Sequence, residues 1–342
     1  MKSKGKILIF YKQMDGYYAE TIAKLGYEPI SFFSDSAEMK LFKKTFWMKY
    51  ENIFRRFFFK DNSYLDRCYK NHVAKSLTKK IEEIAKKHPR IAYSLFFRAD
   101  YYPDEVLEIA RKISGKMITY QFDGMSISQN LIPNISIFDR IFTFDTQDWR
   151  DYKKYQFLPI TNNWFPDAER NNEILQEYIF FYIGVGTPER ILNMEKFKNI
   201  ADKNDWNLSI TLTVSPHIAE KNENGFSVSS KGMTYPENIQ NLKKAKVLID
   251  MKLPYHNGLS YRFFEALYYN KKMITNNEMV KQYDFYHPSN IFITDYNNFD
   301  GIEDFIKKPY HPIDPNIIEK YGAENWLKYI LDLPDHQKIN LP

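Results

Sequence analysis

The chain has 342 residues, more than one hydrophobic core ordinarily fills, so we expect two domains. Its net charge of +5 at pH 7 is too small to indicate nucleic-acid binding, and we expect no such partner. The single cysteine, Cys68, excludes an intramolecular disulfide and a metal cluster built from cysteines. Because the sequence shows no apolar run of eighteen residues and no secretory signal pattern, we expect a cytoplasmic protein, at most peripheral to the inner face of the cell membrane.

The first half of the chain alternates short apolar runs with helical patterns. Strands are predicted at 6–11, 29–33, 91–97, 116–122, 139–145 and 157–160, and helices at 18–25, 72–87, 103–113 and 147–155. This alternation is typical of a parallel sheet flanked by helices. The loop after the first strand contains only Gly16, so it lacks the three-glycine dinucleotide fingerprint and disfavours a nicotinamide-binding enzyme.

Acidic residues follow two of these strands, at the edge where ligands collect in open α/β sheets. Asp123 comes directly after the strand at 116–122 and could act as a general base toward an acceptor hydroxyl. Asp15, after the first strand, is the second candidate for that base. Either carboxylate could instead hold its loop by accepting backbone N–H groups. Arg98 and Asp100 are further candidates at the same edge.

Residues 40–60 contain seven basic and eight aromatic side chains against one acid. Such a segment can lie in a membrane interface or bind an anionic, lipid-linked acceptor. It can equally form a helix whose aromatic side chains enter the core, because the aromatic residues do not follow one clean helical face. The pattern leaves these interpretations open.

The second half repeats the alternation after a polar stretch at 161–177, which suits an interdomain linker. Strands are predicted at 178–183, 207–213, 247–251, 273–275 and 290–294, and helices at 189–202, 235–245, 301–307 and 316–331, with one more between 251 and 273. A second parallel α/β domain is therefore expected.

The turn after the strand at 178–183 has the composition of an anion site. Gly184 and Gly186 would let the backbone approach a phosphate closely, and Thr187 and Arg190 would add hydrogen-bond donors. Two glycines at this spacing are weak evidence alone. A second turn of similar character in the same half makes the interpretation more persuasive.

That second turn leads into the helix between 251 and 273. Gly258 and Ser260 stand near its start, where free backbone N–H groups and the helix dipole favour an anion such as a pyrophosphate. Arg262 adds donors there, and Glu265, one turn further on, could accept from sugar hydroxyls. The same spacing also fits an ordinary packed helix with a hydrogen-bonded glutamate.

The segment 254–277 resembles the donor-sugar motif of GT-B glycosyltransferases, in which seven residues separate two glutamates. Glu265 matches the second glutamate, and Asn257 stands at the position of the first. Five segments together resemble the bacterial capsule and lipopolysaccharide biosynthesis proteins related to the CgeB-like group: 120–125, 138–145, 154–159, 181–186 and 258–265.

This resemblance implies an α/β protein with a GT-B fold, in which two Rossmann-like domains with mostly parallel sheets face each other across a cleft. Residues 1–165 would bind the acceptor, residues 166–315 would bind the nucleotide sugar, and residues 316–342 would form a C-terminal helix crossing back to the first domain. Glu265 would hold the nucleotide ribose. The implied donor site comprises Gly184, Gly186, Thr187, Arg190, Asn257, Gly258, Ser260, Tyr261, Arg262 and Glu265.

The function that follows is glycosyl transfer from a nucleotide-activated sugar to a bacterial surface-glycan acceptor, such as a lipid-linked lipopolysaccharide or capsule precursor. No Asp-x-Asp element stands at a plausible strand end, so we expect neither a metal nor a cofactor besides the donor substrate. The main alternative is a non-catalytic nucleotide-sugar or glycan-binding protein of the same fold. A nucleic-acid-binding protein acting through residues 40–60 and a nucleotide-sugar epimerase are weaker alternatives.

Overall fold

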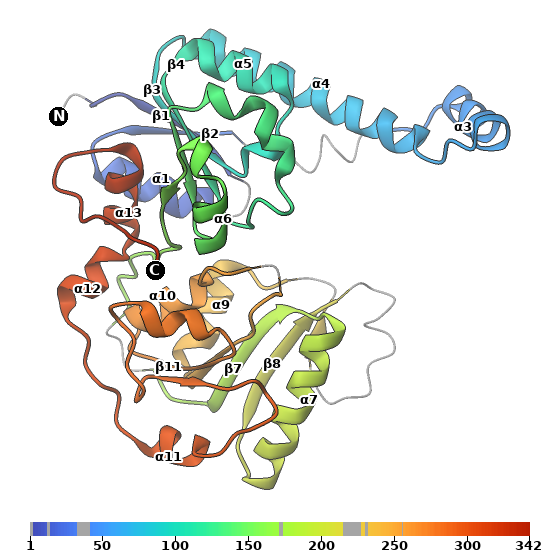
Figure 1. The fold of residues 1–342 in the computed structure, drawn as a ribbon. Coiled ribbons are helices and arrows are strands. Elements are labelled where there is room, and N and C mark those ends of the chain that lie inside the picture. The colour runs from blue at the N-terminus through green and yellow to red at the C-terminus, as the bar shows by residue number, and fades with distance from the viewer. Residues whose placement is uncertain are drawn as a thin grey trace. The chain divides into compact units, whose positions relative to one another are not determined.

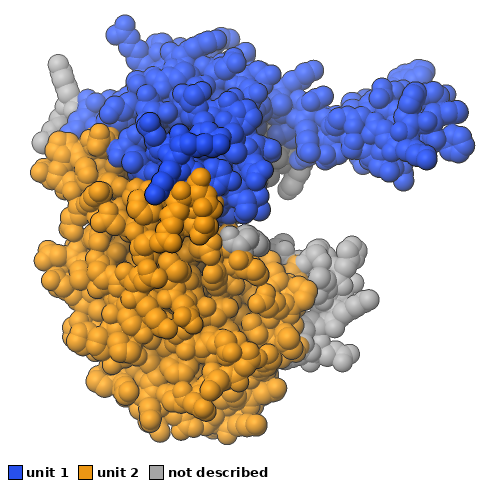
Figure 2. Space-filling view, viewed as in Figure 1, with its two compact units in different colours: residues 1–143, 152–158 blue, residues 144–151, 159–342 orange. Residues whose placement is uncertain are grey.

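The computed structural model describes residues 3–11, 14–32, 42–170, 174–214, 227–229, 232–254 and 256–342. The chain divides into two compact units, which Figure 2 shows in different colours. Unit 1 comprises Met1–Thr143 and Tyr152–Leu158, and unit 2 comprises Phe144–Asp151 and Pro159–Pro342. Each unit contains its own six-stranded sheet.

Unit 1 is built on a sheet of strand order β2-β1-β3-β4-β5-β6, and its paired strands from β2 to β5 run parallel. Its elements, drawn in blue to green in Figure 1, are β1 (Lys6–Phe10), α1 (Asp15–Lys24), β2 (Glu28–Ser31), α3 (Phe46–Phe59), α4 (Tyr64–Lys87), β3 (Ile91–Phe97), α5 (Asp104–Ile113), β4 (Ser114–Gln121), η2 (Gln129–Ile137), β5 (Arg140–Thr143), η3 (Lys153–Tyr155) and β6 (Leu158–Pro159).

Unit 2 is built on a sheet of strand order β12-β11-β10-β7-β8-β9, in which all the paired strands run parallel. Its elements are α6 (Thr146–Asp151), β7 (Tyr178–Val185), α7 (Pro188–Lys203), β8 (Leu208–Thr213), β9 (Ser227–Ser229), α9 (Tyr235–Lys243), β10 (Ala245–Asp250), α10 (Tyr261–Tyr268), β11 (Lys272–Thr275), η4 (Glu278–Gln282), β12 (Ile291–Ile293), α11 (Ile302–Lys307), α12 (Pro315–Lys320) and α13 (Ala323–Leu331).

The central strands are continuous apolar runs, as expected of parallel sheets that helices cover on both faces. Ile7 to Phe10 of β1 and Val247 to Ile249 of β10 are fully buried. Helices begin where capping residues allow: Thr234 and Glu237 form a capping box at α9, and Thr187 caps α7 ahead of Pro188. The predicted α/β alternation is therefore confirmed in both halves.

The prediction of one C-terminal helix at 316–331 is wrong. The structure has two helices there, α12 and α13, and the helical backbone is interrupted near Gly322. There the backbone N–H of Trp164 donates to Tyr321 O at 3.1 Å, and the N–H of Ala323 donates to Trp164 O at 2.9 Å. A Cβ at Gly322 would come within 2.7 Å of the Trp164 indole ring. The hydrogen bonds to Trp164 thus interrupt a segment whose local sequence pattern predicts one continuous helix.

The segment 40–60 is described from residue 42 onward and contains helix α3. None of the α3 residues, all of which the structure describes, is buried. The interpretation in which its aromatic side chains enter the core is therefore wrong. Helix α4, which follows, buries only Leu77 and Ile81, both in its second half. Within unit 1, α3 accordingly lies at the far end of α4, away from the sheet (Figure 1).

Candidate functional site

The carboxyl ends of the unit 2 strands meet at a point where the strand order reverses. β7 is the first strand of this sheet along the chain, and it lies between β8 and β10. The chain leaves β7 toward β8 on one side and leaves β10 toward β11 on the other. The loops after β7 and β10 therefore diverge, and ligands of open α/β sheets bind in the crevice at such a point. Both predicted anion-binding turns follow these two strands.

The first turn of α10 lies at this edge and has no side-chain cap among the described residues. Ser260 occupies the N-cap position, but its hydroxyl donates to Asp250 Oδ1 at 2.7 Å. By contrast, the N-cap side chain of α7, Thr187, accepts from the backbone N–H of Arg190. The first turn of α10 thus lacks the side-chain oxygen that usually satisfies a helix N-terminus, and the helix dipole adds partial positive charge there. The arrangement suits an anionic oxygen.

The loop before α10 is fixed from several sides. The backbone N–H of Asn257 donates to Asp145 Oδ2 at 2.8 Å, and the Gly258 carbonyl accepts from Asn277 Nδ2 at 3.0 Å. A Cβ at Gly258 would come within 2.5 Å of the Phe144 carbonyl oxygen. Glycine at 258 is therefore required by close packing, and Asn257 serves to position the loop.

Two arginines, Arg190 and Arg262, connect the strand ends at this edge. Arg262 Nη1 donates to Ile249 O at 2.8 Å and its Nη2 donates to Ile183 O, which joins β10 to β7. Arg190 Nη2 donates to Met251 O, and its buried Nε has no hydrogen-bond partner among the described residues. The Nη atoms of both arginines thus donate to backbone carbonyls, and the two positive charges lie at the strand ends.

Glu265 lies one turn into α10 with only 4% of its surface exposed. Burial raises the pKa of its carboxyl to about 6, although Arg262 and hydrogen bonds from Tyr235 and Asn238 act in the opposite direction. Both hydrogen-bonding neighbours belong to α9. The carboxyl therefore sits between two helices as a buried acid, and its predicted contact with the donor ribose stays a prediction.

The two glycines near the end of β7 also have packing roles: Gly184 lies within β7, opposite Leu212 of β8, so the turn predicted at 184 begins later, and Gly186 follows the strand. A Cβ at Gly184 would come within 2.5 Å of the Tyr182 hydroxyl, and one at Gly186 would come within 2.5 Å of Val214 Cγ1. Gly186 also donates its N–H to Thr213 O at 2.9 Å, which ties the turn to β8. Thus the structure places Gly184 and Gly186 beside the strand ends, where their small size serves packing.

Sequence reasoning missed two residues at this edge, Asp250 and Tyr182. Asp250 ends β10, is buried, accepts from Ser260, and lies 3.8 Å from Arg262. The Tyr182 hydroxyl is buried without a hydrogen-bond partner among the described residues, and the Arg262 guanidinium lies 5.3 Å from its ring centre. An acid at the end of an apolar strand is the one signal that could have identified Asp250. Tyr182 gives no such signal, because it lies within an apolar strand, where the sequence predicts an ordinary core residue.

A hollow of about 970 Å³ opens in unit 2 near the first turn of α7. Glu189 and Asn193 of α7, Asn276 after β11 and Tyr286 line it, together with β12. Asn276 also accepts from the backbone N–H of Lys252, just beyond β10. The hollow therefore adjoins the strand ends that carry the candidate site, and its size is that of a small-molecule pocket.

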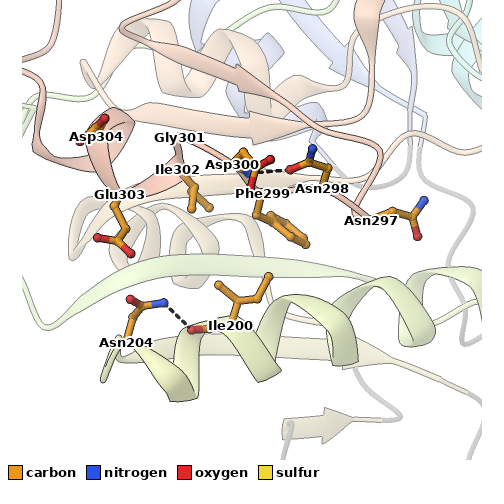
Figure 3. Close-up of a pocket in the computed structure, with 10 residues that line it drawn as sticks. All are labelled: Ile200, Asn204, Asn297, Asn298, Phe299, Asp300, Gly301, Ile302, Glu303 and Asp304. Carbon is orange, nitrogen blue, oxygen red and sulfur yellow. Dashed lines mark hydrogen bonds between the residues drawn. The ribbon is translucent and has the colours of Figure 1, made fainter.

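A second hollow, of about 540 Å³, is shown in Figure 3. Ile200 and Asn204 at the carboxyl end of α7 line it, opposite the loop that leads into α11. Asp300, Glu303 and Asp304 give this lining acidic side chains, which disfavour a phosphate. None of the predicted site residues lines it. Asn297, Asn298 and Asp300 line both this hollow and the larger one, so the two hollows are adjacent.

Asp123 lies in unit 1, in a polar cluster after β3 and β4. The buried guanidinium of Arg98 donates to Asp100 Oδ1 at 2.8 Å and Oδ2 at 2.7 Å, and it also pairs with Asp123. Tyr101 hydrogen-bonds to Asp123 as well. The Asp123 carboxylate remains partly exposed, with 26% of its side-chain surface accessible. The structure therefore brings Arg98, Asp100 and Asp123 together at one sheet edge.

Asp15, the second candidate base, is the first residue of α1, and its side chain lies outside what the structure describes. It follows β1, the strand beside β3 in the sheet. Asp123 and Asp15 are both in unit 1, whereas every predicted donor-binding residue is in unit 2.

No protein-family model and no curated protein matches the chain. Solved structures resemble it at low identity. The UDP-GlcNAc 2-epimerase from Neisseria meningitidis bound to UDP-GlcNAc has a TM-score of 0.56 and 11% identity, covering 96% of this chain and 98% of that one. The putative UDP-N-acetylglucosamine 2-epimerase from Listeria monocytogenes has a TM-score of 0.52 and 10% identity, covering 96% and 95%. The glycosyltransferase SnogD from Streptomyces nogalater has a TM-score of 0.44 and 10% identity, covering 95% and 98%.

At such low identity these similarities concern the fold alone. The two parallel sheets with flanking helices and the near-complete coverage of both chains agree. The predicted fold class is therefore confirmed, whereas membership of the CgeB-like group stays a prediction. The chain has the GT-B fold, in which two Rossmann-like α/β units are joined in one polypeptide.

Proposed function

We propose that the protein is a glycosyltransferase that moves a sugar from a nucleotide-activated donor to a hydroxyl of a bacterial surface-glycan precursor, of the lipopolysaccharide or capsule type. The observation that carries the proposal is the first turn of α10, which lies at the strand-order reversal of unit 2 and receives no side-chain cap from the residues that the structure describes. Nucleotide sugars present a diphosphate or monophosphate, and such a helix start is a favourable site for phosphate oxygens.

The charge that builds on the leaving phosphate would be met by groups of the chain itself. The N–H groups of α10 and the charges of Arg190 and Arg262 stand at the same strand ends. Fixed dipoles and cations at the place where charge develops stabilise a transition state effectively. We therefore propose transfer without a divalent metal and without a cofactor.

The acceptor oxygen would attack the anomeric carbon as the bond between that carbon and the phosphate oxygen breaks. The proton of the acceptor hydroxyl would pass to a carboxylate, for which Asp123 is the first candidate and Asp15 the second. The partial exposure of Asp123 supports this role, and its contacts with Arg98 and Tyr101 would orient it.

The nucleoside of the donor would occupy the hollow lined by Glu189, Asn276 and Tyr286. Its volume of about 970 Å³ is sufficient, and its neighbour Lys252 follows the strand that leads to α10. Tyr286 would provide an aromatic surface beside the base. Asn257, at the position of the first glutamate of the donor motif, would contact the sugar less strongly than a carboxylate.

The acceptor would be linked to a lipid, with the protein peripheral at the inner face of the cell membrane. The exposed basic and aromatic residues between 42 and 60 support this placement. None of the helices that the structure describes combines the length and apolarity needed to cross a bilayer.

Epimerisation of a nucleotide sugar is a second candidate function, because the solved structures with TM-scores of 0.52 and 0.56 are described as UDP-GlcNAc 2-epimerases. The GT-B fold serves both reactions, so the reaction must be tested directly. A protein that only binds nucleotide sugars is the non-catalytic alternative.

The test is incubation of the full-length protein with uridine, guanosine, cytidine and thymidine diphosphate sugars and with cytidine monophosphate sugars, with and without lipid extracts from a bacterial envelope. A transferase releases nucleotide and labels the extract with sugar. Formation of an epimerised sugar without any extract supports the epimerase and overturns the transfer proposal. Saturable binding without released nucleotide or altered sugar supports the binder.

The donor site is tested by Ser260→Asp against the nearly isosteric Ser260→Asn. Each is a good N-cap residue, but only Asp adds a negative charge at the start of α10. We expect Ser260→Asp to weaken nucleotide binding at least tenfold relative to Ser260→Asn, because a unit charge about 5 Å from a phosphate costs on the order of 3 kcal/mol. Thermal unfolding controls for repulsion between the new carboxylate and Asp250. Equal nucleotide affinity of the two variants would place the phosphate elsewhere.

A further inference from the structure

Helix α3 carries most of its apolar side chains on one face, with Met48 and Phe59 outside it. At about 100° per residue, seven apolar side chains fall within an arc of about 140°. They are Phe46, Trp47, Tyr50, Ile53, Phe54, Phe57 and Phe58. The aromatic residue of α3 that departs from this face is Phe59, the last residue of the helix.

This apolar face points away from the protein. Phe57 is 80% exposed, Trp47 74% and Ile53 68%. Aromatic neighbours contact one another along the face, with ring centres of Phe54 and Phe58 4.7 Å apart. Amphipathic helices of globular proteins ordinarily turn their apolar face to the core. In α3 the apolar face is exposed instead.

The opposite face of α3 explains how the helix is held. Its partly buried residues are Met48, Glu51, Asn52 and Arg55. Arg55 Nε donates to Glu51 Oε1 at 2.7 Å, and its guanidinium lies 5.0 Å from the ring centre of Tyr64, the first residue of α4. A mostly polar face thus attaches α3 to α4, which leaves the apolar face for another surface.

The charge around α3 indicates which kind of surface its apolar face contacts. Residues 42–60 contain six basic residues and one acidic residue, a net charge of +5 that equals the net charge of the entire chain. Lys49 and Arg56 lie beyond one edge of the apolar arc, Lys43 and Lys44 precede the helix, and Lys60 follows it. The basic excess of the protein is therefore concentrated at the helix with the exposed aromatic face.

We propose that α3 binds the interface of an anionic lipid bilayer, lying in the membrane plane with its aromatic face among the headgroups and upper acyl chains. Exposed apolar residues on one side with lysine and arginine around them are the pattern of interfacial helices, and Trp and Tyr favour the headgroup level. A protein groove would fit the apolar face but would not account for the surrounding lysines, which are depleted in the centres of protein interfaces. Figure 2 shows the end of unit 1 formed by α3 and α4 standing clear of its remainder.

Vesicle binding of the full-length protein tests this proposal without measuring turnover, so failure of the glycosyltransferase proposal would not affect it. Trp47 is the reporter, because it is the only exposed one of the five tryptophans, all of which the structure describes. We expect its emission to shift to the blue with vesicles in which about one-third of the phosphatidylcholine is replaced by phosphatidylglycerol, and far less with phosphatidylcholine alone. The Trp47→Phe variant should still sediment with the anionic vesicles but lose the shift.

Variants separate the apolar and charged contributions. Replacing Ile53 and Phe57 by Ser should lower the vesicle partition coefficient at least tenfold, whereas Leu175→Ser, at an 83% exposed site in unit 2, should leave it unchanged. Replacing Lys43, Lys44 and Lys49 by Gln should lower it by roughly fivefold for each lysine near the surface, and only for anionic vesicles. None of these side chains is in the core, so far-ultraviolet circular dichroism should not change.

Two results would overturn the proposal. One is that neither vesicle composition retains the protein or shifts its emission. The other is a blue shift that grows with protein concentration without lipid and is accompanied by dimers in analytical ultracentrifugation. In that case a second copy of the chain, rather than a membrane, covers the apolar face.

Discussion

Replacing Glu265 by Gln tests the central buried group of the candidate site. The substitution keeps the shape of the side chain and removes its charge. Burial holds the pKa of the carboxyl at about 6, against an ordinary value of 4.5. A difference of about 1.5 pH units corresponds to about 2 kcal/mol between the protonated and ionised forms.

The sign of the pH dependence follows from which state holds the proton. Between pH 4.5 and about 6 the folded protein keeps a proton on Glu265 that the unfolded chain has lost. The free energy of unfolding contributed by this group therefore decreases as pH rises through that window and is constant above it. Glutamine does not titrate, so the stability of Glu265→Gln relative to the natural protein should rise by about 2 kcal/mol across the window.

The assay is urea unfolding of both proteins at several pH values from 4 to about 7, since the difference between them cancels other titrating groups. Any constant change from altered hydrogen bonds to Tyr235 and Asn238 leaves the pH dependence intact. Glu237→Gln is the control: hydrogen bonds from Thr234 lower the pKa of Glu237 below its ordinary value of 4.5, so its removal should cost stability equally at every pH above about 4.5 and less below that value.

The reasoning is refuted if the stability difference for Glu265→Gln is flat between pH 4 and 7, since the carboxyl would then not be a buried acid. Nucleotide affinity gives a separate readout. If Glu265 accepts from ribose hydroxyls, Glu265→Gln and Glu265→Ala should both weaken donor binding while remaining folded. Unchanged affinity in both variants would remove Glu265 from the donor site.

Two further substitutions test the loop before α10 and the polar cluster of unit 1. Gly258→Ala should destabilise the protein by about 1–3 kcal/mol in urea unfolding, because its Cβ would overlap Phe144. Gly16→Ala, where a Cβ meets nothing within 4 Å, should be neutral or slightly stabilising, so equal losses from both glycines would contradict the packing argument. Asp123→Asn should lower turnover by about 10²-fold or more with donor affinity unchanged, which is the signature of a lost general base. Full activity of Asp123→Asn would restrict the carboxylate to its contact with Arg98.

The glycines show where sequence and structure give different physical reasons for one residue. Gly184, Gly186 and Gly258 suggested close approach to a phosphate. In the structure each stands at the predicted strand edge, yet each also avoids a clash with a neighbouring protein atom. A glycine in a sequence indicates a close approach without naming the partner, because the approaching atoms come from distant parts of the chain.

The hydrogen-bond partners of the arginines also lie far away along the chain. Arg262 was predicted beside the turn, and it is there, but its partner Ile183 lies 79 residues away along the chain. No local pattern relates these two positions. Only the tertiary structure shows that the guanidinium joins β7 to β10 through two backbone carbonyls.

The sequence alone determined the α/β alternation and the parallel sheets, because apolar periodicity and capping residues act over a few neighbouring residues. It also located the turn before α10 as the place to expect an anion. Only the tertiary structure decided that Asp250 takes the hydroxyl of Ser260 away from the helix start, and that α3 turns its aromatic face outward. Periodicity identifies an apolar face, but what that face meets depends on contacts between residues far apart in the chain.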